Sequence, residues 1–246
     1  MALEQPAWPL PRGATALTST RDGGASAGPY ADFNLAMHVG DDPAAVEHNR
    51  ARLAAALPAG TSVRWLRQVH GTRVVDDGDD AAVPADAAVS RRPGIACAVL
   101  TADCLPVLFC SADAGVVAAA HAGWRGLADG VLEATIEAMA VDPGELSAWL
   151  GPAIGPRAFE VGPEVREAFE AQWPGDRAVL DEAFRPGRED RLHADLHALA
   201  SARLAAAGVT TCHRDTRCTA SVPGRFYSWR RDGETGRMVS LILINP

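Results

Sequence analysis

The chain has 246 residues, of which 48% are hydrophobic and 22% charged, so it is long and apolar enough to bury a substantial core. Its formal net charge of −8, with no long basic run, argues against a protein dedicated to nucleic acid. No apolar stretch approaches the roughly 18 to 20 residues that cross a bilayer, and the first residues lack the pattern of a signal peptide. We therefore expect a cytoplasmic protein, a monomer or small homo-oligomer, that binds neither membrane nor nucleic acid.

The first half of the chain predicts short strands around one clear helix. The first forty residues are rich in glycine, serine and threonine and favour strands and loops. Asp42 is suited to cap a helix that begins at Pro43 and ends near Leu57. Apolar runs of strand length follow at 63–66, 72–75, 95–100, 105–110 and 116–120.

The second half alternates helices and strands less regularly. A helix is expected at 124–140, a strand at 146–150, a helix at 163–173 and a polar, irregular segment at 174–191. Asp195 caps a further helix that ends at Gly208, and 226–231 and 237–244 resemble a hairpin joined by 232–236. This irregular alternation favours a single α+β domain over 1–246, with mixed β-sheets flanked by helices.

Three segments place a metal-binding side chain at the end of an apolar strand, beside small residues. They contain His70, Cys104 and His121. Two imidazoles and one thiolate give three protein ligands, and tetrahedral zinc then keeps a fourth position for water or substrate. The ligands are far apart in sequence, unlike the paired ligands of a zinc finger, which favours an open catalytic site. Taken alone, the cysteine is more typical of packing and each histidine is as compatible with a structural role, so the prediction depends on their joint placement.

Four motifs resemble the laccase-domain purine nucleoside phosphorylases, a family also labelled polyphenol oxidase or peptidoglycan editing factor. They are Gln-Val-His-Gly (68–71), Thr-Ala-Asp-Cys-Leu-Pro-Val-Leu (101–108), His-Ala-Gly-Trp-Arg-Gly-Leu (121–127) and Gly-Pro-Ala-Ile-Gly-Pro (151–156). The similarity extends from about residue 20 to the C-terminus. It implies that His70, Cys104 and His121 bind zinc within a single domain of sheets and helices.

The resemblance also implies a reaction. Its members convert adenosine and phosphate to adenine and ribose 1-phosphate, accept inosine and methylthioadenosine, and deaminate adenosine as a side activity. Purine nucleoside and phosphate are therefore the expected small-molecule partners. Zinc could activate water for deamination, or orient phosphate or a ribose hydroxyl, and the sequence does not choose between these roles.

Further residues are candidates for substrate or phosphate binding. Arg50 falls on the apolar face of its helix, where it either snorkels to solvent or points into a polar cavity. Arg125 begins the helix after His121, whose N-terminus favours anions, although pairing with a surface acid is as compatible. Asn34, His38 and Gln68 lie in segments that match the family, and they are further candidates for substrate binding. Asp103, beside Cys104, is a candidate proton acceptor, with support of the metal site or structural capping as alternatives.

Three other functions are compatible with parts of this pattern. A copper oxidase could use the same His-Cys-His ligands, but a multicopper enzyme also needs His-X-His pairs and the sequence contains none. A cytosolic enzyme that edits peptidoglycan precursors remains open. A non-catalytic, metal-stabilised module fits an open three-ligand site poorly.

Overall fold

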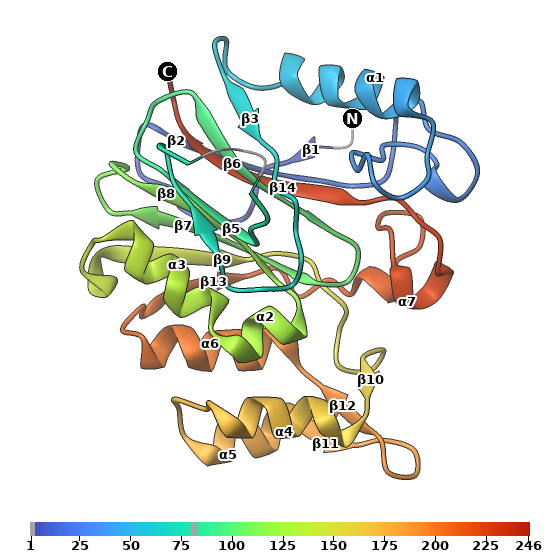
Figure 1. Cartoon of the computed structure of the whole chain (residues 1–246), viewed down its shortest axis with the longest axis vertical. Coiled ribbons are helices and arrows are strands. Elements are labelled where there is room, and N and C mark those ends of the chain that lie inside the picture. Colours follow the sequence, from blue (N-terminus) through green and yellow to red (C-terminus); the bar gives the residue numbers. More distant parts are fainter. Residues whose placement is uncertain (1–2, 80–82) are drawn as a thin grey trace.

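Two large β-sheets packed face to face form the centre of the protein. The computed structural model describes residues 3–79 and 83–246 (Figure 1). The first sheet has the order β1-β2-β14-β6-β3, with strands β1 (Leu3–Glu4), β2 (Ala14–Ser19), β14 (Met238–Ile244), β6 (Ile95–Thr101) and β3 (Ser62–Arg64). The second has the order β13-β9-β7-β8-β5-β4, with strands β13 (Thr211–Arg214), β9 (Leu146–Leu150), β7 (Leu105–Ser111), β8 (Val117–Ala122), β5 (Ala87–Ser90) and β4 (Val74–Val75).

Both sheets are mixed, because parallel strands join an otherwise antiparallel centre. In the first sheet, β14 pairs antiparallel with β2 and β6, whereas β3 runs parallel to β6. In the second, β4 and β13 are the parallel edge strands. Strand β6 shows why the sequence signal was strong: Cys97 and Val99 pack between the sheets, and Ala96, Ala98 and Leu100 pack on the opposite face. A strand buried on both faces appears in the sequence as a continuous apolar run.

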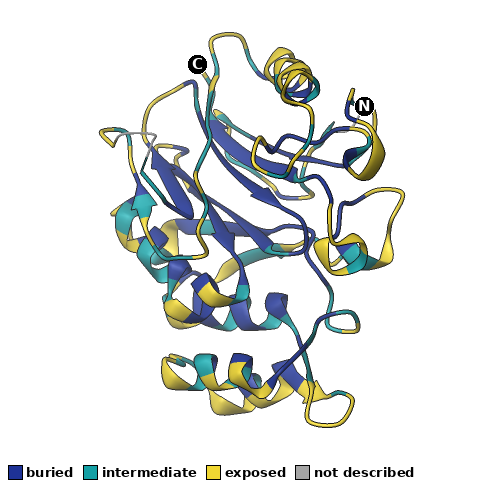
Figure 2. Ribbon diagram, turned by 45° about the vertical axis from the view of Figure 1, so that its right-hand side comes forward, coloured by how far each residue is buried: buried dark blue, intermediate teal, exposed yellow. Residues whose placement is uncertain are grey.

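Helices cover the outer face of each sheet (Figure 1). The helices of the described residues are α1 (Pro43–Ala55), α2 (Trp124–Asp129), α3 (Val131–Met139), α4 (Pro163–Ala171), α5 (Arg177–Ala183), α6 (Leu196–Ala206) and α7 (Trp229–Asp232), of which α4 and α5 lie beyond α2 and α6, away from the two large sheets. Helix α1 covers the first sheet through Leu53, and α2, α3 and α6 cover the second. Exposed residues concentrate on the outer surfaces of α1, α4 and α5 (Figure 2). The predicted single α+β domain of mixed sheets flanked by helices is confirmed. Among the described residues, no helix is long and apolar enough to cross a membrane.

Helix α1 begins where the sequence predicted, whereas the single helix predicted after His121 is two helices, α2 and α3. The side chain of Asp42 accepts a hydrogen bond from the Ala44 N–H, and Pro43 is the first helical residue, as expected. The predicted helix 124–140 is instead divided at Gly130, whose φ of 98° ends α2 and begins α3. Glycine adopts that conformation without a steric penalty.

The segment 174–191 was wrongly predicted to be irregular. It contains α5 and β11 (Phe184–Pro186), which joins β10 (Glu160–Val161) and β12 (Leu192–Ala194) in a small third sheet. The Asp176 side chain caps α5 by accepting from the Ala178 N–H, and Leu180 is fully buried against the core. A short helix with one buried face carries too few apolar residues to give a clear periodic pattern.

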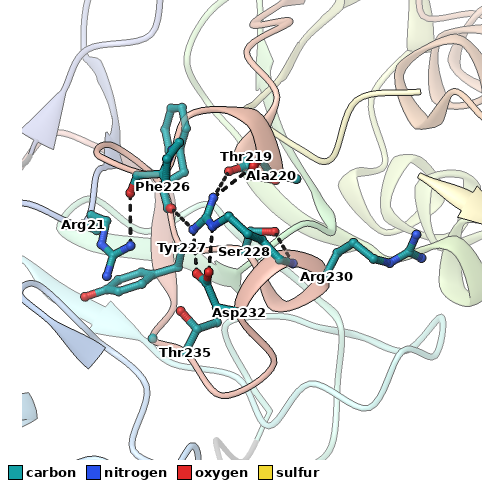
Figure 3. A network of polar contacts seen from close by, with 12 residues as sticks. Arg21, Thr219, Ala220, Phe226, Tyr227, Ser228, Arg230, Asp232 and Thr235 are labelled. Carbon is teal, nitrogen blue, oxygen red and sulfur yellow. Dashed lines mark hydrogen bonds and ion pairs between the residues drawn. The ribbon is translucent and has the colours of Figure 1, made fainter. Parts of the chain in front are cut away.

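The predicted C-terminal hairpin is also wrong. Residues 226–231 do not pair with β14, whose neighbours are β2 and β6, and Trp229–Asp232 forms helix α7. The guanidinium of Arg231 donates to the backbone carbonyls of Thr219, Ala220 and Phe226 and pairs with Asp232 (Figure 3). These contacts fold the segment onto the preceding loop, which holds it away from the sheet.

Candidate metal centre

The three predicted ligands come together at one end of the sandwich. His70 lies in the connection between β3 and β4, Cys104 links β6 of the first sheet to β7 of the second, and His121 is near the end of β8. One donor atom from each side chain lies within 4.8 Å of the others. The imidazole rings of His70 and His121 meet edge to face, with centroids 4.8 Å apart. Residues distant in sequence thus form one cluster.

The donor set fits a tetrahedral metal ion. Zinc bonded to sulfur at about 2.3 Å and to nitrogen at about 2.0–2.1 Å holds two such donors roughly 3.5 Å apart. Cys104 Sγ and His70 Nε2 are separated by 3.7 Å. His121 uses Nδ1 to contact a carboxylate, so its Nε2 is left to face the other two donors. Three ligands leave a fourth position for water or substrate.

Asp86, which lies in none of the predicted motifs, organises the cluster. Its side chain is fully buried, and its Oδ1 lies 2.8 Å from His121 Nδ1. The same carboxylate accepts hydrogen bonds from three successive backbone N–H groups, those of Val69, His70 and Gly71, at 2.8–3.0 Å. His70 has a φ of 62°, in the left-handed region that is unfavourable for a side-chain-bearing residue. Asp86 therefore holds one ligand by its ring and the other by its backbone.

The electrostatics favour a thiolate at Cys104. Burial raises the pKa of this thiol, but the charge of His121 and hydrogen bonds from both histidines outweigh burial and lower the pKa to about 6. Burial lowers the pKa of His121, but the Cys104 thiolate and Asp86 outweigh it and raise the pKa to about 9. By contrast, burial raises the pKa of both Cys97 and Cys110 to about 12. Cys104 is the thiol of these three in the form that binds metals at neutral pH.

Two glycines leave room for the ligands. A Cβ on Gly123 would lie 2.7 Å from His70 Cδ2 and 3.1 Å from Cys104 Sγ. A Cβ on Gly126 would lie 2.8 Å from the carbonyl oxygen of Gly71. The β8–α2 connection therefore approaches the His70 turn more closely than any larger residue permits.

We expect Gly123→Ala to weaken metal binding by about 10-fold or more, because the new methyl group displaces His70. The φ of Gly123 is −64°, which alanine adopts freely, so the effect is confined to the site. Metal affinity measured by competition with a chromophoric chelator tests this. Gly224→Ala is the matched control, because a Cβ there meets nothing within 4 Å. Equal affinities in the two variants would contradict the steric account.

The metal triad (His70, Cys104, His121) lines one cavity. The other residues around this cavity are His38, Gln68, Leu100, Thr101, Ala102, Asp103, Trp124, Ile154, Phe159, Trp229, Arg230 and Arg237. Trp229 is 60% exposed, which is unusual for so large an apolar side chain, and lies on α7 at this cavity. The cavity thus combines three candidate metal ligands with aromatic and cationic side chains.

Asp103 connects the metal site to α7. Its buried carboxylate accepts hydrogen bonds from Thr219 Oγ1 at 2.6 Å, Ser228 Oγ at 3.0 Å and the Arg230 N–H at 2.7 Å. With three donors already bound, the carboxylate is engaged in holding α7 against the Cys104 turn. This arrangement favours the supporting role over the proton-acceptor role.

The other predicted site residues divide between the cavity and its surroundings. Gln68 lines the cavity and is fixed by two 2.8 Å hydrogen bonds to the Leu100 backbone. His38 lines the same cavity. Asn34 does not line it: the side chain is fully buried and bonds to Asp41 and to the backbone around it.

The two arginines proposed from sequence also lie outside the cavity lining. Arg50 Nε donates to the Leu35 carbonyl at 2.9 Å, and its guanidinium stacks on Trp65, 4.0 Å from the ring centroid. Arg125 is exposed and stacks on Trp124 at 4.3 Å. Arg237, in contrast, lines the cavity directly and had no sequence signal beyond its place before an apolar strand.

Comparison with known proteins agrees with this architecture. Residues 15–245 match the family described as multi-copper polyphenol oxidoreductase laccase. The chain belongs to this laccase-domain family. It is 52% identical over 237 residues to a purine nucleoside phosphorylase of Pseudomonas aeruginosa, with 96% of each chain covered. It is 51% identical over 239 residues to the purine nucleoside phosphorylase YfiH of Escherichia coli, again with 96% of each covered.

A solved structure shares the whole fold. The crystal structure of a Neisseria meningitidis protein superposes with a TM-score of 0.93 at 45% identity and covers 100% of both chains. The family resemblance seen in the sequence motifs is thus confirmed.

Proposed function

We propose that this laccase-domain protein is a zinc-dependent purine nucleoside phosphorylase that converts adenosine and phosphate to adenine and ribose 1-phosphate. The observation that carries the proposal is the single cavity that unites the metal triad with aromatic walls and a guanidinium. Its relatives of 51–52% identity are named purine nucleoside phosphorylases. Inosine and methylthioadenosine are proposed as further substrates, with deamination of adenosine as a side activity.

The reaction sets clear demands on the cavity. An oxygen of hydrogen phosphate forms a bond to C1′ of the ribose, and the C1′–N9 bond breaks with its electron pair going to the purine. The proton of hydrogen phosphate ends on the purine, so the products are adenine and ribose 1-phosphate. The site therefore has to hold an anion, a sugar and a flat aromatic base at once.

The cavity contains side chains of the types that these three binding tasks require. Trp124, Phe159 and Trp229 present aromatic surface on which a purine base stacks. Gln68, fixed by the Leu100 backbone, forms a rigid wall beside the metal triad, and His38 lies in the same cavity. When bound to the triad, zinc would supply a Lewis acid. The backbone fixed by Asp86 and the turn fixed by Asp103 orient the groups around it.

We propose zinc because three ligands with an open fourth position are typical of catalytic zinc sites. The sequence also lacks the His-X-His pairs that a trinuclear copper cluster uses. The donor set itself binds either metal, so metal analysis of purified protein decides between them.

We expect the purified protein to release adenine from adenosine only when phosphate is present, with ribose 1-phosphate formed in equal amount. Chromatography of reactions with and without phosphate measures both products. Inosine formed in the absence of phosphate would identify deamination as the main reaction. Inactivity toward nucleosides together with turnover of muramyl-peptide precursors would replace this proposal with peptidoglycan editing. Phenol-dependent oxygen uptake would instead identify the copper oxidase.

A further inference from the structure

Arg237 is a cation in the cavity without an acidic partner. It lies immediately before β14, half-buried, in the same cavity as the metal triad. Its Nη1 donates to the carbonyls of Thr235 at 2.7 Å and Gly236 at 3.0 Å. No carboxylate within the described ranges, 3–79 and 83–246, forms an ion pair with it. Its Nε and Nη2 donors therefore remain for a ligand.

The nearby acids are already bound to other groups. Glu234 accepts a hydrogen bond from the Tyr30 hydroxyl, and Asp41 accepts one from the Asn34 side-chain amide at 2.9 Å. Burial lowers the pKa of Arg237, and the more distant charges of Cys104, Asp103 and Tyr30 act in the opposite direction. A half-buried guanidinium with no carboxylate paired to it favours an anion that joins it. The protein holds this charge in place at the cavity wall.

The turn that carries Arg237 is rigidly built. The Arg237 N–H donates to Asn34 Oδ1 at 2.9 Å, so the buried Asn34 fixes the backbone at this position. A Cβ on Gly236 would lie 2.6 Å from the Tyr227 ring, so the turn is packed as closely as glycine allows. Asn34, one of the residues predicted to bind substrate, thus fixes the backbone of Arg237 instead.

His38 shares the electrostatic field of this region. Burial first, and then the positive charges of Arg237 and Arg50, lower the pKa of His38. Both guanidiniums are therefore close enough to act on His38, and of the two only Arg237 lines the cavity. Arg230 also lines the cavity, but it is exposed, and its Nη1 donates to the carbonyls of Ala158 and Glu160. Among the cavity arginines, Arg237 is the more deeply buried.

We infer that Arg237 is the residue that binds inorganic phosphate as co-substrate, through the free edge of its guanidinium. The inference rests on the proposed phosphorolysis and gives it an anion site. A planar guanidinium with adjacent Nε and Nη2 donors matches two oxygens of a phosphate. Arg125 and Arg50, the arginines suggested by sequence, point elsewhere: one is exposed on Trp124, and the other is stacked on Trp65.

Kinetics of two Arg237 variants test the assignment. Arg237→Met is expected to raise the phosphate KM by about 10- to 100-fold, the effect of losing charge-assisted hydrogen bonds, while the nucleoside KM changes little. Arg237→Lys keeps the positive charge but loses the pair of adjacent guanidinium donors. Its phosphate KM should therefore lie between those of Arg237→Met and the wild type. Arg125→Met is the comparison variant and should keep the wild-type phosphate KM. A phosphate KM within twofold of wild type in Arg237→Met would overturn the inference while leaving phosphorolysis itself intact.

Direct binding separates this inference from the proposed function. Calorimetry of inorganic phosphate with the metal-loaded protein should show binding in the wild type and in Arg125→Met, and loss of binding in Arg237→Met of equal metal content and melting temperature. Absence of phosphate binding in the wild type would refute the site whatever the reaction proves to be. Phosphate binding without adenine release would support the Arg237 phosphate site and contradict the proposed phosphorylase activity. Arg237-dependent binding of adenosine 5′-monophosphate, with no binding of free phosphate, would assign the site to a nucleotide phosphate and overturn the inference.

Discussion

Replacing Cys104 with serine is expected to abolish metal binding and catalytic activity together. A serine hydroxyl stays protonated at neutral pH and is a poor substitute for the thiolate that the two histidines stabilise at this position. The loss of metal affinity should exceed about 100-fold, the upper end of what changes outside the ligand shell cost. Metal content after dialysis and adenine release are the two measurements.

The controls for Cys104→Ser separate chemistry from folding. Cys212→Ser alters a half-buried cysteine on the edge strand β13 and should retain metal and activity. Thermal melting in the presence of a chelator should be similar for Cys104→Ser and the wild type, because neither then holds metal. Full activity in Cys104→Ser would refute the metal assignment. Loss of activity with unchanged metal content would place the sulfur in the chemistry and not in metal binding.

Asp86→Asn is expected to have the second largest effect, although Asp86 does not contact the metal position. Each carboxylate oxygen accepts two hydrogen bonds: Oδ1 from the His70 N–H and the His121 ring, and Oδ2 from the Val69 and Gly71 N–H groups. Whichever way the asparagine is turned, its NH2 group faces donors. We expect metal affinity to fall by about 10- to 100-fold and the free energy of unfolding to fall by about 1–3 kcal/mol.

The comparison variant for Asp86→Asn is Asp113→Asn. Asp113 accepts from Ser111 Oγ and the Gly115 N–H in the exposed turn after β7, at the opposite end of that strand from Cys104. Chemical denaturation gives the stability, and chelator competition gives the metal affinity. If the two variants lose metal affinity equally, Asp86 has no special place in the site. If Asp86→Asn loses stability but binds metal as wild type, its role is confined to the His70 backbone.

The sequence predicted most of the architecture because the relevant signals are local. Strands β6, β7 and β8 are buried on both faces and therefore appear as apolar runs. Each metal ligand sits within a short motif at the end of an apolar run, and a glycine closely follows each of the two histidines. The C-terminal hairpin failed because the side chains that decide its structure come from elsewhere. Asp103 fixes the start of α7 through Ser228 and Arg230, a contact across more than a hundred residues.

The residues around the metal ligands were harder to predict because their roles depend on contacts between segments that are distant in sequence. Asp86 occupies an ordinary position at the start of a strand, and only the folded chain brings it against both histidines. Arg50 was suggested by its helical face, yet that face directs it onto Trp65. Arg237 precedes a strand without any distinctive motif, and its importance lies in the absence of an acidic partner among the described residues. These properties depend on tertiary contacts that no local pattern encodes.

X-ray absorption at the metal edge of the purified protein tests the central claim most directly. The account predicts one metal ion per chain with one sulfur ligand at about 2.3 Å and its remaining ligands nitrogen or oxygen at about 2.0–2.2 Å, as expected for zinc held by one cysteine and two histidines. The sulfur contribution should disappear from Cys104→Ser reconstituted at high metal concentration. A metal ion without a sulfur ligand in the wild type, or several metal ions per chain, would contradict the assignment of His70, Cys104 and His121 as the site.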